Sequence, residues 1–107
     1  MRLQIVAWVL LLAGPGLAQG QNTATLEGDI EYGRYLSSEC VTCHQVSGAD
    51  EGIPSIIGWE QDTFVSVLEA YQKRKLPNPV MRNIAANLDR QQIQALAVFF
   101  GTLPLPE

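Results

Sequence analysis

The chain is 107 residues long and acidic, with 7 lysine and arginine residues against 11 aspartate and glutamate residues and a formal net charge of −4. A chain of this length is expected to form one small domain, whose apolar core is marginal on its own. The negative balance argues against a nucleic-acid-binding protein, because binding to phosphates needs a basic face.

The N-terminus has the layout of a secretory signal peptide. The first two residues form a short positive segment, residues 3–13 are apolar and nearly uncharged, and small residues stand at Gly16 and Ala18. The apolar run is shorter than the roughly 20 residues that a membrane-spanning helix needs. We therefore expect residues 1–18 to be a cleaved signal peptide and the mature chain to be periplasmic, without a membrane span. Retention of the segment as an N-terminal anchor is the alternative.

The next residues predict a short leader followed by a helix. Residues 19–25 are polar and resemble a flexible leader. From Leu26 the apolar spacing becomes helical, because Tyr32, Tyr35 and Leu36 fall at positions i, i+3 and i+4. This helix would lead directly to the first cysteine, so the domain is expected to comprise residues 26–107.

The middle of the chain predicts a long loop and a second helix. Residues 46–58 contain three glycines and a proline, which indicates irregular structure. Residues 61–75 have apolar residues at i, i+4 and i+7, namely Phe64, Leu68 and Tyr71. The basic residues 73–75 would then occupy the last turn, where cations interact favourably with the helix dipole.

In the C-terminal third, the sequence predicts a break in helical structure and then a last helix. Pro77 and Pro79 argue against a helix over residues 76–80. Asp89 and Gln92 have the spacing of a capping box. An apolar helical spacing then follows at Ile93, Leu96, Ala97 and Phe100. No segment has a convincing strand pattern, so the sequence predicts an all-α fold.

Residues 40–44, which read Cys-Val-Thr-Cys-His, form a C-x-x-C-H motif, the attachment signature of a c-type haem. The thiols of Cys40 and Cys43 would add to the two haem vinyl groups, and His44 would ligate the iron. A redox-active dithiol is one alternative, although no βαβ pattern surrounds the motif. A zinc site is another, but a closed site needs four ligands and the sequence has no other cysteine or histidine.

Met81 is the candidate for the second axial ligand. It is the only methionine that remains once Met1 leaves with the signal peptide, and no second histidine is available. A haem iron between histidine and methionine is a closed, high-potential electron carrier. The alternatives are that Met81 is ordinary core packing, that Lys73 or Lys75 displaces it at alkaline pH, or that the sixth position is open. An open position would suit a haem enzyme or a gas sensor.

The order of these features over residues 26–103 resembles a class I c-type cytochrome. The resemblance implies about four helices and long loops wrapped around one covalently attached haem c. It also implies that Cys40 and Cys43 are the thioether attachments, His44 the proximal ligand and Met81 the distal ligand.

Two structural details follow from the same resemblance. Residues 52–58 resemble the haem-pocket loop of that family, which implies that the Pro54 carbonyl accepts the proton on His44 Nδ1 and orients the ring. The first and last helices are expected to cross closely. The candidates for that crossing are Gly33 with Tyr32 or Tyr35 on one side, and Leu96 with Phe99 or Phe100 on the other.

Residues 81–89 and 96–100 are similar to the cytochrome subunit of flavocytochrome c sulfide dehydrogenases. In that family a methionine is followed by a basic residue, then Ile-Ala, then a short link into the last helix. The similarity implies that a separate FAD-containing subunit oxidises sulfide and that this chain, which is not itself catalytic, receives the electrons. A free electron shuttle to an oxidase or another dehydrogenase is the alternative.

Overall fold

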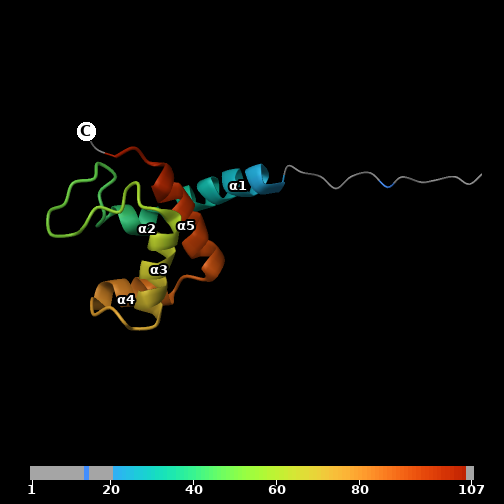
Figure 1. Cartoon of the computed structure of the whole chain (residues 1–107). Coiled ribbons are helices and arrows are strands. Elements are labelled where there is room, and N and C mark those ends of the chain that lie inside the picture. The colour runs from blue at the N-terminus through green and yellow to red at the C-terminus, as the bar shows by residue number, and fades with distance from the viewer. Residues whose placement is uncertain (1–13, 15–20, 106–107) are drawn as a thin grey trace, which may run out of the picture.

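The computed structural model describes residue 14 and residues 21–105, with side chains from residue 29 onward in the helical part. The predicted signal peptide, residues 1–18, lies outside the described residues apart from Gly14. The described chain is helical, without a strand, which confirms the all-α class. Its helices are α1 (Gln21–Leu36), α2 (Ser38–Val41), α3 (Gln61–Gln72), α4 (Pro79–Ala86) and α5 (Arg90–Thr102) (Figure 1). None of these helices has the length and hydropathy needed to cross a membrane.

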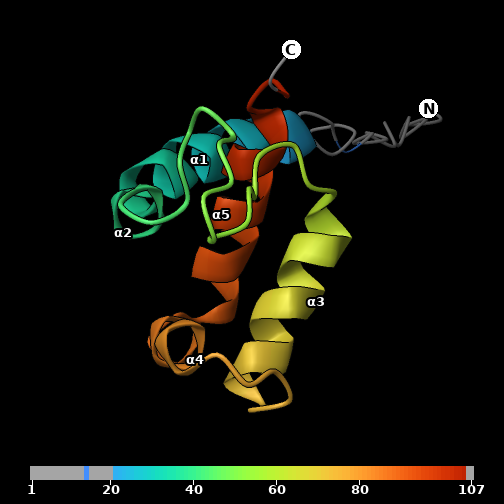
Figure 2. The same ribbon diagram turned by 90° about the vertical axis from the view of Figure 1, so that its left-hand side faces the viewer.

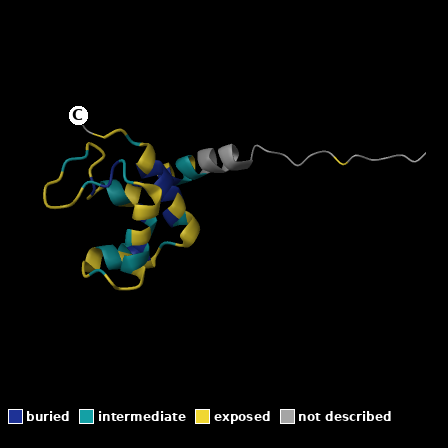
Figure 3. Cartoon of the chain, in the orientation of Figure 1, coloured by how far each residue is buried: buried dark blue, intermediate teal, exposed yellow. Residues whose placement is uncertain are grey.

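Helix α5 is the centre of the fold. Its residues from Ala95 to Phe100 are all buried (Figure 3). The ring of Phe100 stacks on that of Phe64 from α3 at a centroid distance of 5.8 Å, and it meets the ring of Phe99 edge-on at 5.2 Å. Helix α3 runs beside α5, while α1 and α4 lie at opposite ends of this pair (Figures 1 and 2).

The capping box predicted at the start of α5 is confirmed. The backbone N–H of Gln92 donates to Asp89 Oδ1 at 2.8 Å, and the N–H of Asp89 donates to Gln92 Oε1 at 2.9 Å. Both bonds satisfy N–H groups that have no partner within the helix. The capping box involves only residues three positions apart, so it can be predicted from the sequence.

Helix α1 begins earlier than the apolar spacing predicts. It starts at Gln21 rather than Leu26, so residues 21–25, assigned by composition to a flexible leader, are helical. This stretch has neither proline nor glycine to stop a helix, and a single alanine is its only apolar residue, which is too little for a periodicity argument. Sequence spacing thus located the helix but not its first turns.

Helices α1 and α5 cross at Gly33. A methyl group placed on Gly33 would collide with the carbonyl oxygen of Ala95 and lie 2.6 Å from Cβ of Phe99. The predicted close crossing and the roles of Gly33 and Phe99 in it are confirmed. Tyr35 was wrongly included, because it is 77% exposed. Positions 33 and 35 differ by about 200° around a helix, so both cannot face the same neighbour.

Replacing Gly33 by alanine should destabilise the protein by about 1–3 kcal/mol, because the added methyl group overpacks the crossing. Urea unfolding followed by circular dichroism measures this change. Gly101→Ala is the matched control, since Gly101 is also helical but its added methyl group would lie 3.3 Å from its nearest neighbour, the Trp59 carbonyl oxygen. Equal midpoints for the Gly33→Ala variant and the parent would contradict the crossing.

The end of α3 differs from the prediction. The helix ends at Gln72, so residues 73–75 follow it instead of forming its last turn. Arg74 takes a left-handed conformation with φ of 59°. The N–H of Lys75 bonds to the Ala70 carbonyl at 2.9 Å and that of Arg74 to the Tyr71 carbonyl at 3.0 Å. These two bonds form a Schellman motif, in which an arginine stands where glycine is usual.

The start of α4 also corrects the expectation of a break over residues 76–80. The helix begins at Pro79, with Asn78 as its N-cap. Proline is excluded from helix interiors but suits the first helical position, where its missing N–H has no partner to lose. Only Pro77 therefore acts as a breaker, and Met81 stands in the first turn of a helix.

Candidate cofactor site

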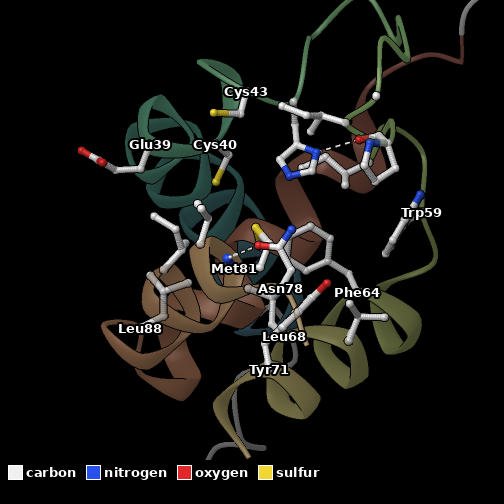
Figure 4. Close-up of a pocket in the computed structure, with 18 residues that line it drawn as sticks. Glu39, Cys40, Cys43, Trp59, Phe64, Leu68, Tyr71, Asn78, Met81 and Leu88 are labelled. Carbon is white, nitrogen blue, oxygen red and sulfur yellow. Dashed lines mark hydrogen bonds between the residues drawn. The ribbon is translucent and has the colours of Figure 1, made fainter. Parts of the chain in front are cut away.

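A cavity of about 340 Å³ lies between α2, the loop over residues 52–59, α3 and α4 (Figure 4). Its volume falls within the range of small-molecule sites, roughly 300–1,000 Å³. All five residues predicted for the site line it, namely Cys40, Cys43, His44, Pro54 and Met81. The remaining walls are mostly apolar, formed by Ile53, Ile56, Trp59, Phe64, Val67, Leu68, Tyr71, Val80, Ile84 and Leu88, with Gly52, Glu39 and Asn78 completing the lining.

The two cysteines are positioned by the single turn of α2 and the turn after it. The N–H of Cys43 donates to the Cys40 carbonyl at 3.1 Å, and the N–H of His44 donates to the same oxygen at 2.7 Å. Cys40 is half-buried and Cys43 exposed, and neither forms a disulfide. Figure 4 shows both at one side of the cavity, with Trp59 at the other.

The environment of Cys40 is unlike that of a redox-active dithiol. Burial, together with the neighbouring negative charge of Glu39, raises the pKa of the Cys40 thiol from 9.0 to about 11. Reactive cysteines depend on a lowered pKa that yields the thiolate near neutral pH. The raised pKa keeps this thiol neutral in the chain alone, which disfavours the thioredoxin-like alternative.

His44 is buried and has its ring orientation fixed. Its Nδ1 lies 2.6 Å from the carbonyl oxygen of Pro54, the hydrogen bond that the sequence resemblance implies (upper dashed line in Figure 4). A carbonyl oxygen only accepts, so Nδ1 carries the hydrogen. In the neutral ring the lone pair is then on Nε2, which is the form needed to ligate a metal.

Met81 reaches the cavity from the first turn of α4. Its backbone N–H donates to Oδ1 of the N-cap residue Asn78 at 3.1 Å (lower dashed line in Figure 4). The side chain is half-buried and packs against the core formed by α3 and α5. The N-cap therefore fixes the backbone of the residue that presents the only thioether among the described residues.

Other cavity residues were not singled out as site residues from the sequence. Asn78 falls in the segment predicted to be a break, although Asn followed by Pro is a typical N-cap and first-position pair. Val80, Ile84 and Leu88 recur at intervals of four, which is a helical signal that the neighbouring prolines obscured. Trp59 also lines the cavity, and its ring meets that of Phe64 edge-on at a centroid distance of 6.3 Å.

A zinc site finds little support in these side chains. Among the described residues, no group of three or more His, Cys, Asp and Glu side chains is arranged to hold a metal ion. A structural zinc ion requires four such ligands. The donors at this cavity are instead one imidazole, two thiols and one thioether.

No family model matches the chain, and no curated protein matches it with significant similarity.

Proposed function

We propose that the chain is a monohaem c-type cytochrome that transfers single electrons. The main support is that the C-x-x-C-H segment and Met81, far apart in the sequence, line the same apolar cavity. Cys40 and Cys43 would hold the haem covalently, and His44 and Met81 would be its axial ligands. Export to the periplasm, inferred from residues 1–18, belongs to the same proposal.

The donor atoms fit this cofactor. An imidazole nitrogen and a thioether sulfur are the axial ligands of electron-carrying cytochromes c. Two thiols separated by two residues, directly before the histidine, match covalent attachment at one porphyrin edge. The apolar walls match a large, flat, apolar ligand, which would also enlarge a core that is small for an independent domain.

The chain's own residues would keep the site ready for electron transfer. When bound, the haem supplies an iron that alternates between Fe(III) and Fe(II). The Pro54 carbonyl accepts the hydrogen on Nδ1 and so holds His44 in one tautomer. Phe64, Leu68 and Trp59 give the cavity apolar walls, which would keep water from the bound group and limit the rearrangement of solvent when its charge changes.

The similarity of residues 81–89 and 96–100 points to one electron donor. We propose an FAD-containing sulfide dehydrogenase subunit as that donor. Stopped-flow mixing of such a flavoprotein, reduced by sulfide, with the oxidised cytochrome should give reduction that saturates with cytochrome concentration. Slow reduction that never saturates would contradict this donor and favour the alternative, a free electron shuttle that serves another partner.

The direct test of the cofactor is expression of the full chain in a bacterium that attaches haem to exported cytochromes. The protein should keep a haem stain on a denaturing gel, because thioether bonds survive unfolding. Its mass should equal that of the cleaved chain plus one haem. An exported, soluble chain of the expected length without haem would contradict the proposal.

A further inference from the structure

Arg82 follows Met81 directly in α4 but is not part of the cavity lining. Its Nε donates to the carbonyl oxygen of Leu76 at 2.6 Å, and its Nη2 donates to the carbonyl oxygen of Arg74 at 2.9 Å. Both acceptors belong to the loop over residues 73–78, which joins α3 to α4. Adjacent residues of a helix point about 100° apart, so Met81 can reach the cavity while Arg82 holds the loop.

The Schellman bonds of Arg74 and Lys75 tie the start of the loop over residues 73–78 to α3. Arg74 adopts a φ of 59°, which a residue with a Cβ adopts only at a cost. Pro77 and the first residue of α4, Pro79, have no N–H to donate. The guanidinium of Arg82 therefore supplies the charged donors that tie this loop to the helix carrying Met81.

The two ends of α4 are held by separate contacts. At its start, Asn78 Oδ1 accepts from the Met81 N–H, and the Asn78 carbonyl accepts from the Arg82 N–H at 3.0 Å. At its end, Nε2 of Gln72 donates to the carbonyls of Ala85 at 3.0 Å and Leu88 at 2.8 Å. Of these contacts, only those of the Arg82 side chain join the helix to the middle of the preceding loop.

We propose that Arg82 is a positioning residue for Met81. By bonding two loop carbonyls, Arg82 holds the first turn of α4 against the cavity. The Met81 thioether then stays where it can serve as the proposed second ligand. Without it, the loop and the first turn can move outward together and carry Met81 away while the rest of the fold is intact. This inference rests on the proposed ligation of haem by His44 and Met81.

The test is the rate at which the reduced holoprotein binds CO, because CO can reach an iron capped by methionine only when Met81 leaves. In Arg82→Gln the shorter side chain cannot reach both carbonyls, and CO binding should be about tenfold faster or more. Arg82→Lys keeps the charge and one bonding nitrogen, so its rate of CO binding should lie between those of the parent and Arg82→Gln. Arg90→Gln, at an exposed arginine in the first turn of α5, should bind CO at the parent rate.

Urea unfolding followed by far-UV circular dichroism separates local opening from general loss of stability. The inference predicts faster CO binding in Arg82→Gln with little change of the unfolding midpoint. An unchanged CO rate would overturn the role of Arg82 but not the ligation by Met81. The same holds for a CO rate that rises only in proportion to the equilibrium constant for global unfolding. A parent protein that binds CO at once would overturn the Met81 ligation, and this inference with it.

Discussion

On the proposed ligation by His44 and Met81, replacing Met81 by alanine is expected to open the iron and lower its reduction potential. The thioether favours Fe(II), so its loss should lower the potential by on the order of 0.1 V, part of the roughly 0.8 V range that axial ligands control. The reduced variant should also bind CO rapidly, because nothing else in the described chain offers a soft sixth ligand from this side of the cavity. Spectroelectrochemical titration and CO difference spectra measure both effects.

The matched control for this change is Ile84→Ala. Ile84 is a half-buried apolar residue of α4 that lines the same cavity but carries no donor atom. Its truncation should leave the iron closed to CO and shift the potential far less than Met81→Ala. A Met81→Ala protein that is still low-spin, with an unchanged potential, would exclude Met81 as the ligand.

Replacing Cys40 and Cys43 together by serine is expected to abolish covalent haem attachment. The protein should then accumulate several-fold less, because an already small core would lose the large apolar group that the proposal places beside it. Each single serine variant keeps one thiol and should fall between the double variant and the parent. Haem staining and total protein staining of the same denaturing gel, compared with the parent, measure attachment and accumulation.

Ser38→Ala serves as the control for the cysteine variants. Ser38 is an exposed residue of α2, the same short helix, and its hydroxyl makes only a long bond of 3.4 Å to the Tyr35 carbonyl. Its haem content and yield should equal those of the parent. A folded, haem-free double-serine variant at normal yield would show that haem is not a structural part of the core.

The features that depend on near neighbours in the sequence were predictable. Apolar residues three or four apart located α3 and α5, and the pairing of Asp89 with Gln92 fixed where α5 begins. Helix α4 was missed because proline breaks a helix interior but begins a helix well, and composition alone does not distinguish the two positions.

The candidate site was predictable for a different reason. The C-x-x-C-H motif is contiguous, and the scarcity of methionine and histidine reduced the remaining choice to Met81. The His44–Pro54 hydrogen bond was expected from the family resemblance rather than from spacing. The bonds from Arg82 to the Arg74 and Leu76 carbonyls depend on the path of a loop, which no local pattern encodes.

The most direct measurement is the visible and near-infrared absorption spectrum of the oxidised and reduced protein, exported with its haem attached. Ligation by His44 and Met81 predicts sharp low-spin bands on reduction and a weak band near about 695 nm in the oxidised form, typical of methionine bound to Fe(III). A high-spin spectrum without that band would contradict the electron-transfer proposal and indicate an open iron.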